Sequence, residues 1–197
     1  MLCFNQMTFS FNAEPLLENI TLNIPEKHVG IVGRNGVGKT TLLRLIAGYI
    51  TPNSGTISTT KSVYYADSDM SKYRNFLYTD LLDICATMHS FTLEHVHEYI
   101  ESLGLQPFTN TPLGECSKGT QKKIPLLLAL CSTSELLLID EPFESVDSWS
   151  NEGFIQQLLR RKSNYIIVSH DFNWLKRCVE TTYMIENQTL SKEQNYE

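Results

Sequence analysis

A glycine-rich loop at residues 33–40 constrains the fold of this chain more than any other feature. The loop reads Gly-Arg-Asn-Gly-Val-Gly-Lys-Thr and stands between an apolar run at 29–32 and a helical run at 41–47. This spacing matches the phosphate-binding loop, which joins a buried strand to a helix. Its glycines let successive N–H groups converge on one concavity at the positive end of the helix dipole. The alternative is a glycine-rich turn that binds nothing, and three later stretches weigh against it.

The loop carries the expected ligands of a bound nucleotide. The Lys39 amine can reach the β- and γ-phosphates, and the Thr40 hydroxyl can join the coordination shell of Mg²⁺. The residues expected to bind the nucleotide in or beside the loop are Gly33, Asn35, Gly36, Gly38, Lys39, Thr40 and Thr41.

Composition limits the class of protein. The chain has 197 residues, which fits one domain or one domain with a small subdomain. Its net charge of −6 disfavours a protein that works mainly by gripping nucleic-acid phosphates. Its five cysteines are dispersed and form no CxxC pair, as is typical of a reducing cytosol. No apolar run approaches the roughly 20 residues that span a bilayer, and the N-terminus has no secretion signal. The sequence therefore predicts a cytoplasmic location.

Apolar alternation and short apolar runs predict the strands, of which residues 2–11 are expected to be an edge strand. Further strands are expected at 16–24, 28–32, 56–59, 62–66, 136–139, 165–168 and 182–185. Helices are expected at 41–47, within 75–105, at 117–131, at 149–161 and from 172. Residues 1–66 and 132–190 then form an α/β core with an N-terminal β subdomain, 70–131 an inserted helical subdomain, and 191–197 a polar tail.

Two acidic residues follow a buried strand about a hundred residues after Lys39. The apolar run at 136–139 places this strand in the centre of the sheet, so that Asp140 and Glu141 emerge at its carboxyl edge, where open parallel sheets bind ligands. Asp140 can hold Mg²⁺, and Glu141 can polarise the water that attacks the γ-phosphate. An acidic turn without function is the alternative, and it is disfavoured beside a phosphate-binding loop.

A histidine follows the next predicted strand in the same way. The run at 165–168 delivers His170 to the same edge of the sheet, where its imidazole can contact the γ-phosphate. Ser169 and Asp171 are also good helix N-cap residues, so a capping turn is a second role for this segment. Both roles are compatible.

The third stretch includes Ser117-Lys118-Gly119 at the start of a predicted helix, whose N–H groups can form an anion site. Together with the loop and Asp140-Glu141, it resembles the ATP-binding-cassette (ABC) ATPases, whose signature is Leu-Ser-Gly-Gly-Gln. The turn at 144–147 resembles the D-loop of that family. The resemblance covers nearly all of residues 2–187 and implies a P-loop NTPase fold with a mostly parallel core sheet.

The resemblance also implies partners and further ligands. Two cassettes would lie head to tail, as a homodimer or heterodimer, with each ATP between Lys39 of one subunit and Ser117 and Gly119 of the other. Phe11 would stack on the adenine. Membrane-spanning transporter subunits would hold the cassette at the inner face of the cell membrane.

Two departures from the family pattern stand out. The family's Q-loop glutamine is expected after Tyr64-Tyr65-Ala66, but Asp67-Ser68-Asp69 stands there. In addition, Pro125 lies inside the signature helix, where proline costs about 3 kcal/mol, and it is expected to kink that helix.

The leading functional hypothesis is the ATP-hydrolysing subunit of a membrane ABC transporter, with the short cassette and the Ser-Lys-Gly signature favouring an exporter. One alternative is a cytosolic ABC ATPase without a transport role. The other is a subunit that binds ATP with weak hydrolysis, which the missing glutamine favours and Glu141 and His170 disfavour.

Overall fold

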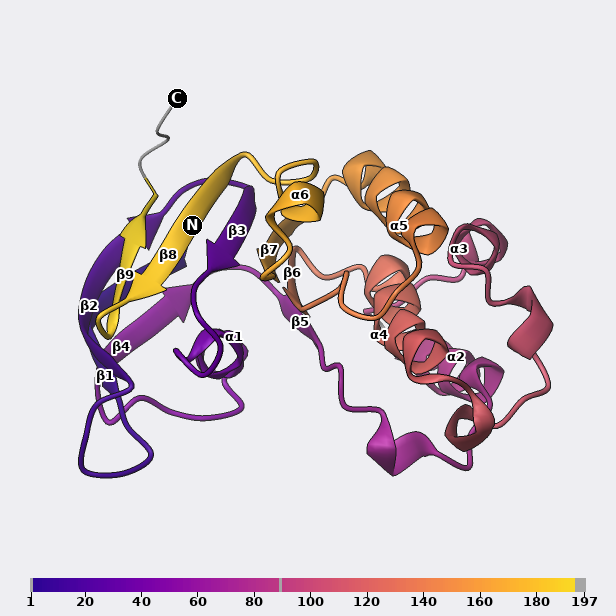
Figure 1. Ribbon diagram of the computed structural model, residues 1–197, viewed down its shortest axis with the longest axis horizontal. Helices are drawn as coiled ribbons and strands as arrows, with labels where there is room; N and C mark the ends of the chain where they lie inside the picture. The colour runs from indigo at the N-terminus through magenta and orange to yellow at the C-terminus, as the bar shows by residue number, and fades with distance from the viewer. Residues whose placement is uncertain (1, 89, 194–197) are drawn as a thin grey trace.

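Two sheets of different construction form the α/β part of the molecule (Figure 1). The structure is a computed structural model that describes residues 2–88 and 90–193. The smaller sheet has the strand order β2-β1-β4 and is antiparallel throughout. Its strands are β1 (Leu2–Phe9), β2 (Leu17–Ile24) and β4 (Ser54–Thr59).

Strand β1 lies in the middle of this smaller sheet, between β2 and β4. The prediction of an edge strand at residues 2–11 is therefore wrong. Alternation of apolar residues records which face of a strand is buried, and a central and an edge strand of an antiparallel sheet share that alternation. The partner strand β4 follows the intervening helix in the chain, so the N-terminal sequence contains no signal that β1 pairs with it.

The larger sheet has the order β5-β6-β7-β3-β8-β9 and is parallel except for the last pair, β8 and β9. Its strands are β3 (His28–Val32), β5 (Val63–Ala66), β6 (Leu136–Asp140), β7 (Asn164–Val168), β8 (Thr181–Glu186) and β9 (Thr189–Lys192). The observed fold thus confirms the predicted mostly parallel core with an antiparallel N-terminal sheet.

Strand β9 corrects the prediction of a polar tail from Ser191. Leu190 is buried and anchors the strand against β8, while its other residues face outward. One buried residue in a four-residue strand leaves too little alternation for sequence reasoning to detect. Residues 194–197 of the predicted tail lie outside the described residues.

The helices form two groups. Helix α1 (Lys39–Ile46) follows β3 directly and packs with the smaller sheet. Helices α2 (Tyr78–Ala86), α3 (Val96–Ser102), α4 (Lys118–Cys131) and α5 (Ser148–Arg160) gather at the other end of the molecule, beyond the core strands (Figure 1). The four-residue helix α6 (Phe172–Leu175) follows β7. Helices α2 to α4 supply the predicted helical insertion.

The core sheet separates two apolar clusters. On β6, Leu137 and Ile139 join the cluster under helices α2–α5, whereas Leu136 and Leu138 join the cluster with α1 and the smaller sheet. Both faces of β6 are therefore covered, which explains its uninterrupted apolar sequence. The polar residues that follow such a strand lie at its carboxyl end, and the candidate site is therefore at this edge of the sheet.

Helix α4 continues through Pro125 from Lys118 to Cys131 as one element, and it is buried from Lys123 onward. A kink at this position stays a prediction. Within the described parts of the chain, no helix combines the length and apolar character needed to cross a bilayer.

Candidate functional site

The loop between β3 and α1 is shaped by glycine. Gly38 is the N-cap of α1 and has a φ of 108°, a left-handed conformation that side chains disfavour. A Cβ atom at Gly38 would also lie 3.1 Å from Cγ of Leu16. The loop can therefore close over Leu16 only with glycine at this position, which leaves the first N–H groups of α1 open at the helix N-terminus.

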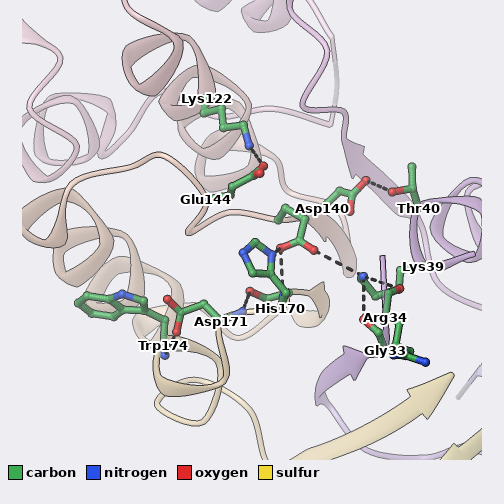
Figure 2. Close-up of polar contacts among 12 residues, drawn as sticks. Gly33, Arg34, Lys39, Thr40, Lys122, Asp140, Glu144, His170, Asp171 and Trp174 are labelled. Carbon is green, nitrogen blue, oxygen red and sulfur yellow. Dashed lines mark hydrogen bonds and ion pairs between the residues drawn. The ribbon is translucent and has the colours of Figure 1, made fainter. Parts of the chain in front are cut away.

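The Lys39 side chain is folded into this loop and is 7% exposed. Its amine donates hydrogen bonds to the carbonyl oxygens of Gly33, at 3.0 Å, and Arg34, at 3.3 Å. The same nitrogen lies 3.8 Å from Oε1 of Glu141 (Figure 2). The cation is thus placed between the loop and the end of β6.

Thr40 and Asp140 are joined directly. The Thr40 hydroxyl donates to Oδ2 of Asp140 at 2.7 Å, whereas the buried Oδ1 has no hydrogen-bond partner among the described residues. Burial raises the pKa of Asp140, against the opposing effect of the Thr40 hydrogen bond. A buried carboxylate with a free oxygen beside a hydroxyl is a donor set of the hard oxygen type that Mg²⁺ prefers. These residues therefore fit the predicted metal.

Glu141 and His170 meet at the ends of β6 and β7. Oε2 of Glu141 accepts the backbone N–H of His170 at 3.1 Å and lies 2.8 Å from Nδ1 of its ring. Glu141 itself has a φ of 46°, a left-handed conformation that is uncommon for a residue with a side chain. The carboxylate is held between Lys39 and His170, where a base for proton abstraction is geometrically possible.

These groups surround one open pocket of about 550 Å³. The predicted residues that line it are Phe11, Asn35, Gly36, Gly38, Lys39, Thr40, Thr41, Glu141 and His170. Gly33 and Asp140 are outside the described lining but form hydrogen bonds with two residues of it, Lys39 and Thr40. The Phe11 ring is 67% exposed at the rim and meets Phe9 edge to face at 4.9 Å.

Two lining residues, Leu16 and Glu144, were not among the predicted site residues. Leu16 is an ordinary apolar residue before β2, and nothing in the local sequence distinguishes it. Glu144 stands three residues after Glu141, and the turn to which it belongs was the available signal.

Ser117 and Gly119 lie apart from the described lining of this pocket. The Ser117 hydroxyl caps α4 by accepting the Thr120 N–H at 3.1 Å. A Cβ atom at Gly119 would lie 2.5 Å from the carbonyl oxygen of Ser145. Gly119 is therefore required within its own subunit, whatever it contacts in a partner, because a side chain would displace Ser145.

Asp67 and Asp69 line a second pocket, of about 610 Å³, between β5 and the helical insertion. Neither is among the described residues that line the first pocket. The departure from the family's glutamine therefore places acids on a different surface, next to aromatic residues such as Tyr64 and Tyr73.

Comparison with known proteins agrees with this geometry. Residues 17–144 match the family model described as ABC transporter. A probable metal transport system ATP-binding protein of Thermotoga maritima is 30% identical over 93% of this chain and 80% of its own length. The structure of an ATP-binding subunit of an ABC transporter has a TM-score of 0.85, at 18% identity, covering 98% of this chain and 90% of that one.

A bacterial ABC transporter cassette solved as a dimer has a TM-score of 0.82 at 20% identity, with each chain covered completely. The family match spans both the phosphate-binding loop and the acids after β6. This chain therefore belongs to the ABC transporter family, as an ATP-binding cassette that hydrolyses ATP.

Proposed function

We propose that the chain drives transport through separate membrane-spanning subunits, by closing with a second cassette on ATP and opening after hydrolysis. The observation that carries this proposal is the convergence of Lys39, the Thr40–Asp140 pair and the Glu141–His170 pair on one pocket. Three segments far apart in the sequence meet there, each with a group that phosphoryl transfer uses.

In this proposal the loop binds the phosphates and Lys39 exchanges its backbone carbonyl partners for phosphate oxygens. A charge-assisted hydrogen bond to phosphate is stronger than one to a neutral carbonyl, so the exchange favours the nucleotide complex. Phe11 stacks on the adenine by its exposed face. Thr40 and Asp140 hold Mg²⁺, which neutralises charge on the phosphates when it is bound.

We assign hydrolysis to Glu141 as the general base. His170, which follows β7, occupies Oε2 of Glu141 with its backbone N–H, at 3.1 Å, and its ring nitrogen Nδ1, at 2.8 Å, so Oε1 is the oxygen left to accept a proton from water. Nζ of Lys39 lies 3.8 Å from Oε1 of Glu141. Glu141 is thereby oriented from both sides before the substrate arrives, which reduces the reorganisation needed at the transition state.

The second half of each site comes from a second cassette in this proposal. Ser117 is exposed at the N-terminus of the 14-residue helix α4, outside the described lining of the nucleotide pocket of its own subunit. Its hydroxyl and the Gly119 N–H would bind the γ-phosphate held by Lys39 of the other subunit. The cassette of similar fold that was solved as a dimer supports the pairing of two cassettes.

Two matched substitutions of Ser117 test the shared site. Asp and Asn both cap helices as well as serine does, so Ser117→Asp and Ser117→Asn leave α4 intact. Only Ser117→Asp places a negative charge against the phosphate of a partner. We expect Ser117→Asp to abolish ATP-dependent dimerisation in size-exclusion chromatography, with Ser117→Asn much closer to the parent and ATP binding by the monomer retained in both.

A mixing experiment then separates a shared site from a site within one chain. Lys39→Ala and Ser117→Asp chains are each inactive in this proposal, but their heterodimer contains one site with both changes and one with neither. ATPase activity should therefore return on mixing, provided that one intact site supports turnover. Dimerisation of Ser117→Asp at the parental level would overturn the shared site.

We further propose that the membrane subunit docks at the second pocket. Its wall combines exposed apolar side chains, Ile84 and Met88, with the carboxylates of Asp67 and Asp69. This pairing suits a helix with apolar residues and a basic residue, at the inner face of the cell membrane.

For the direction of transport we propose export, on the basis of the Ser117-Lys118-Gly119 signature. Uptake of substrate into inside-out vesicles that contain both subunits would support export, and uptake into right-side-out vesicles would contradict it.

A further inference from the structure

The turn after β6 is fastened to the start of α4 within the same subunit. We name residues 141–147 the catalytic turn and residues 117–119 the signature segment. The Gly119 backbone packs so closely on the turn that a Cβ atom there would meet the Ser145 carbonyl oxygen at 2.5 Å. Two ion pairs continue the contact along the next turn of α4, Lys122 with Glu144 and Lys123 with Asp147.

The two ion pairs have different surroundings. Nζ of the buried Lys123 lies 2.7 Å from Asp147, whose carboxylate also caps α5 by accepting from the N–H and hydroxyl of Ser150. This pair belongs to the structural junction of two helices. Lys122 instead pairs with Glu144, which lines the nucleotide pocket together with Glu141 and His170 (Figure 2).

Glu144 is therefore the point at which the nucleotide pocket contacts α4 through a charged group. The hydrogen bond from Lys122 lowers the pKa of Glu144, so the contact favours the ionised carboxylate. The N–H of Glu144 also approaches the carbonyl oxygen of Glu141 at 3.4 Å, which places both acids on one short turn. Lys122 itself is not among the described residues that line the pocket.

The far side of the catalytic turn is held by packing. Phe143 is buried and stacks on Trp174 of α6 at a ring separation of 6.1 Å. Asp171, next to His170, caps that helix by accepting from the N–H groups of Asn173 and Trp174. The turn thus packs on α6 through apolar contact, and it is joined to α4 by the ion pair with Lys122.

We infer that Lys122 is a positioning residue, which fixes the signature segment relative to Glu144. When nucleotide fills the pocket, the signature segment of the same subunit is then in place to bind a second copy of this chain. The inference rests on the proposed shared site. In that arrangement the pocket serves one ATP and the signature segment serves the other. The Lys122–Glu144 pair is then a direct link within one subunit between the two nucleotide sites of the dimer.

The physical reason for a separable effect is the exposure of the pair. The Lys122 and Glu144 side chains are 22% and 49% exposed, and exposed pairs contribute little to folding. Loss of Lys122 should therefore leave the subunit folded and able to bind ATP. Coupling between sites typically changes affinity 5- to 150-fold, and we expect the lower part of that range for a partly exposed pair.

The test uses full-length chains that carry Glu141→Gln, so that hydrolysis does not remove the dimer. Lys122→Gln, Lys122→Arg and Lys192→Gln are compared in this background. Lys192 is a matched control, because it is an exposed lysine that forms an ion pair with Glu26, at 2.6 Å, away from the pocket lining and the catalytic turn. The dimer dissociation constant with ATP and Mg²⁺ is measured by analytical ultracentrifugation, and the ATP affinity of dilute monomer by equilibrium binding.

We expect Lys122→Gln to weaken the dimer at least about fivefold while the ATP affinity of the monomer changes less than twofold. Lys122→Arg should restore dimerisation, since guanidinium keeps the charge, and Lys192→Gln should match the parent. Adding Glu144→Gln to Lys122→Gln should weaken the dimer no further, because the two substitutions remove one interaction.

The outcomes are distinct. A parent that stays monomeric with ATP removes the proposed function and this inference together. A parent that dimerises while Lys122→Gln dimerises equally well overturns the inference alone. An equal loss in Lys192→Gln overturns it, because the effect would then be general. A loss of dimerisation matched by a loss of ATP affinity in the monomer also overturns it, because the effect would then be confined to the pocket.

Discussion

The phosphate-binding loop and the catalytic turn line the same pocket but are built in different ways. The loop is contiguous from Gly33 to Thr40, and its shape comes from backbone conformations that glycine permits. The turn after β6 takes its shape from side chains that other elements supply. Glu141 is held by His170 from β7, Phe143 by Trp174 from α6, and Glu144 by Lys122 from α4.

This difference explains where backbone strain is placed. In the loop the left-handed positions are glycines, which adopt them at little cost. In the catalytic turn they are Glu141, with a φ of 46°, and Ser145, with a φ of 62°. Such conformations cost on the order of 1–3 kcal/mol each and persist only where the surroundings fix them. The turn therefore depends on its tertiary contacts, and the loop depends mainly on its own sequence.

The largest expected effect separates chemistry from binding. Glu141→Gln keeps the size of the side chain and removes its capacity to accept a proton. We expect kcat for ATP to fall about 10²- to 10⁴-fold, while ATP binding remains and the dimer accumulates. Steady-state ATPase assays with size-exclusion chromatography measure both. Turnover at the parental rate would show that Glu141 is not the base.

The next effect tests the loop side of the comparison. Lys39→Ala removes the cation of the loop without changing its glycines, so we expect ATP affinity to fall about 10- to 150-fold, the effect of losing hydrogen bonds to a charged group. Circular dichroism should show a folded chain, and isothermal titration calorimetry measures the affinity. Lys61→Ala is a control outside the described lining of the pocket. Parental affinity in Lys39→Ala would contradict the assigned role.

The smallest effect tests whether the junction of the turn with α4 is electrostatic. Burial alone would raise the pKa of Asp147, but the hydrogen bonds from Lys123 and Ser150 overcome it and lower the pKa to about 2. An aspartate has a pKa of about 3.9 in the unfolded chain. The stabilisation is therefore complete above about pH 4 and is lost as the pH falls toward 2.

Asp147→Asn keeps the helix cap and removes the charge. Since Asp147 is largely exposed, we expect the free energy of unfolding at pH 7 to fall by about 0.2–1 kcal/mol, with a smaller difference from the parent at pH 3. Urea titrations at the two pH values measure it. Asp171→Asn is the matched control, because Asp171 caps α6 with no described lysine partner. An equal loss at both pH values would mean that packing rather than charge fixes the junction.

Much of the site was predictable because its elements are strongly encoded. The apolar runs before the phosphate-binding loop, before Asp140 and before His170 are buried strands in the structure. All three are parallel neighbours, so the polar residues that follow them share one edge of the sheet. Their convergence on one pocket was the expected consequence of that topology.

The missed features have weak local signals. The place of β1 in the middle of its sheet depends on β4, which joins it across about 45 residues of chain. Strand β9 has one buried residue, and Leu16 enters the pocket wall only because Gly38 folds over it. None of these three features depends on a pattern of residues that lie close together in the sequence.

The sequence by itself determined the phosphate-binding loop, most of the strands and helices before β9, and the residues that end the core strands, because each depends on neighbours within a few positions. Only the tertiary structure decided how the catalytic turn is held and that Gly119 packs on Ser145. It also decided that Asp67 and Asp69 line the second pocket. These features join residues that are far apart in the chain, and their free energy arises from contacts that exist only after the helical insertion has packed on the core sheet.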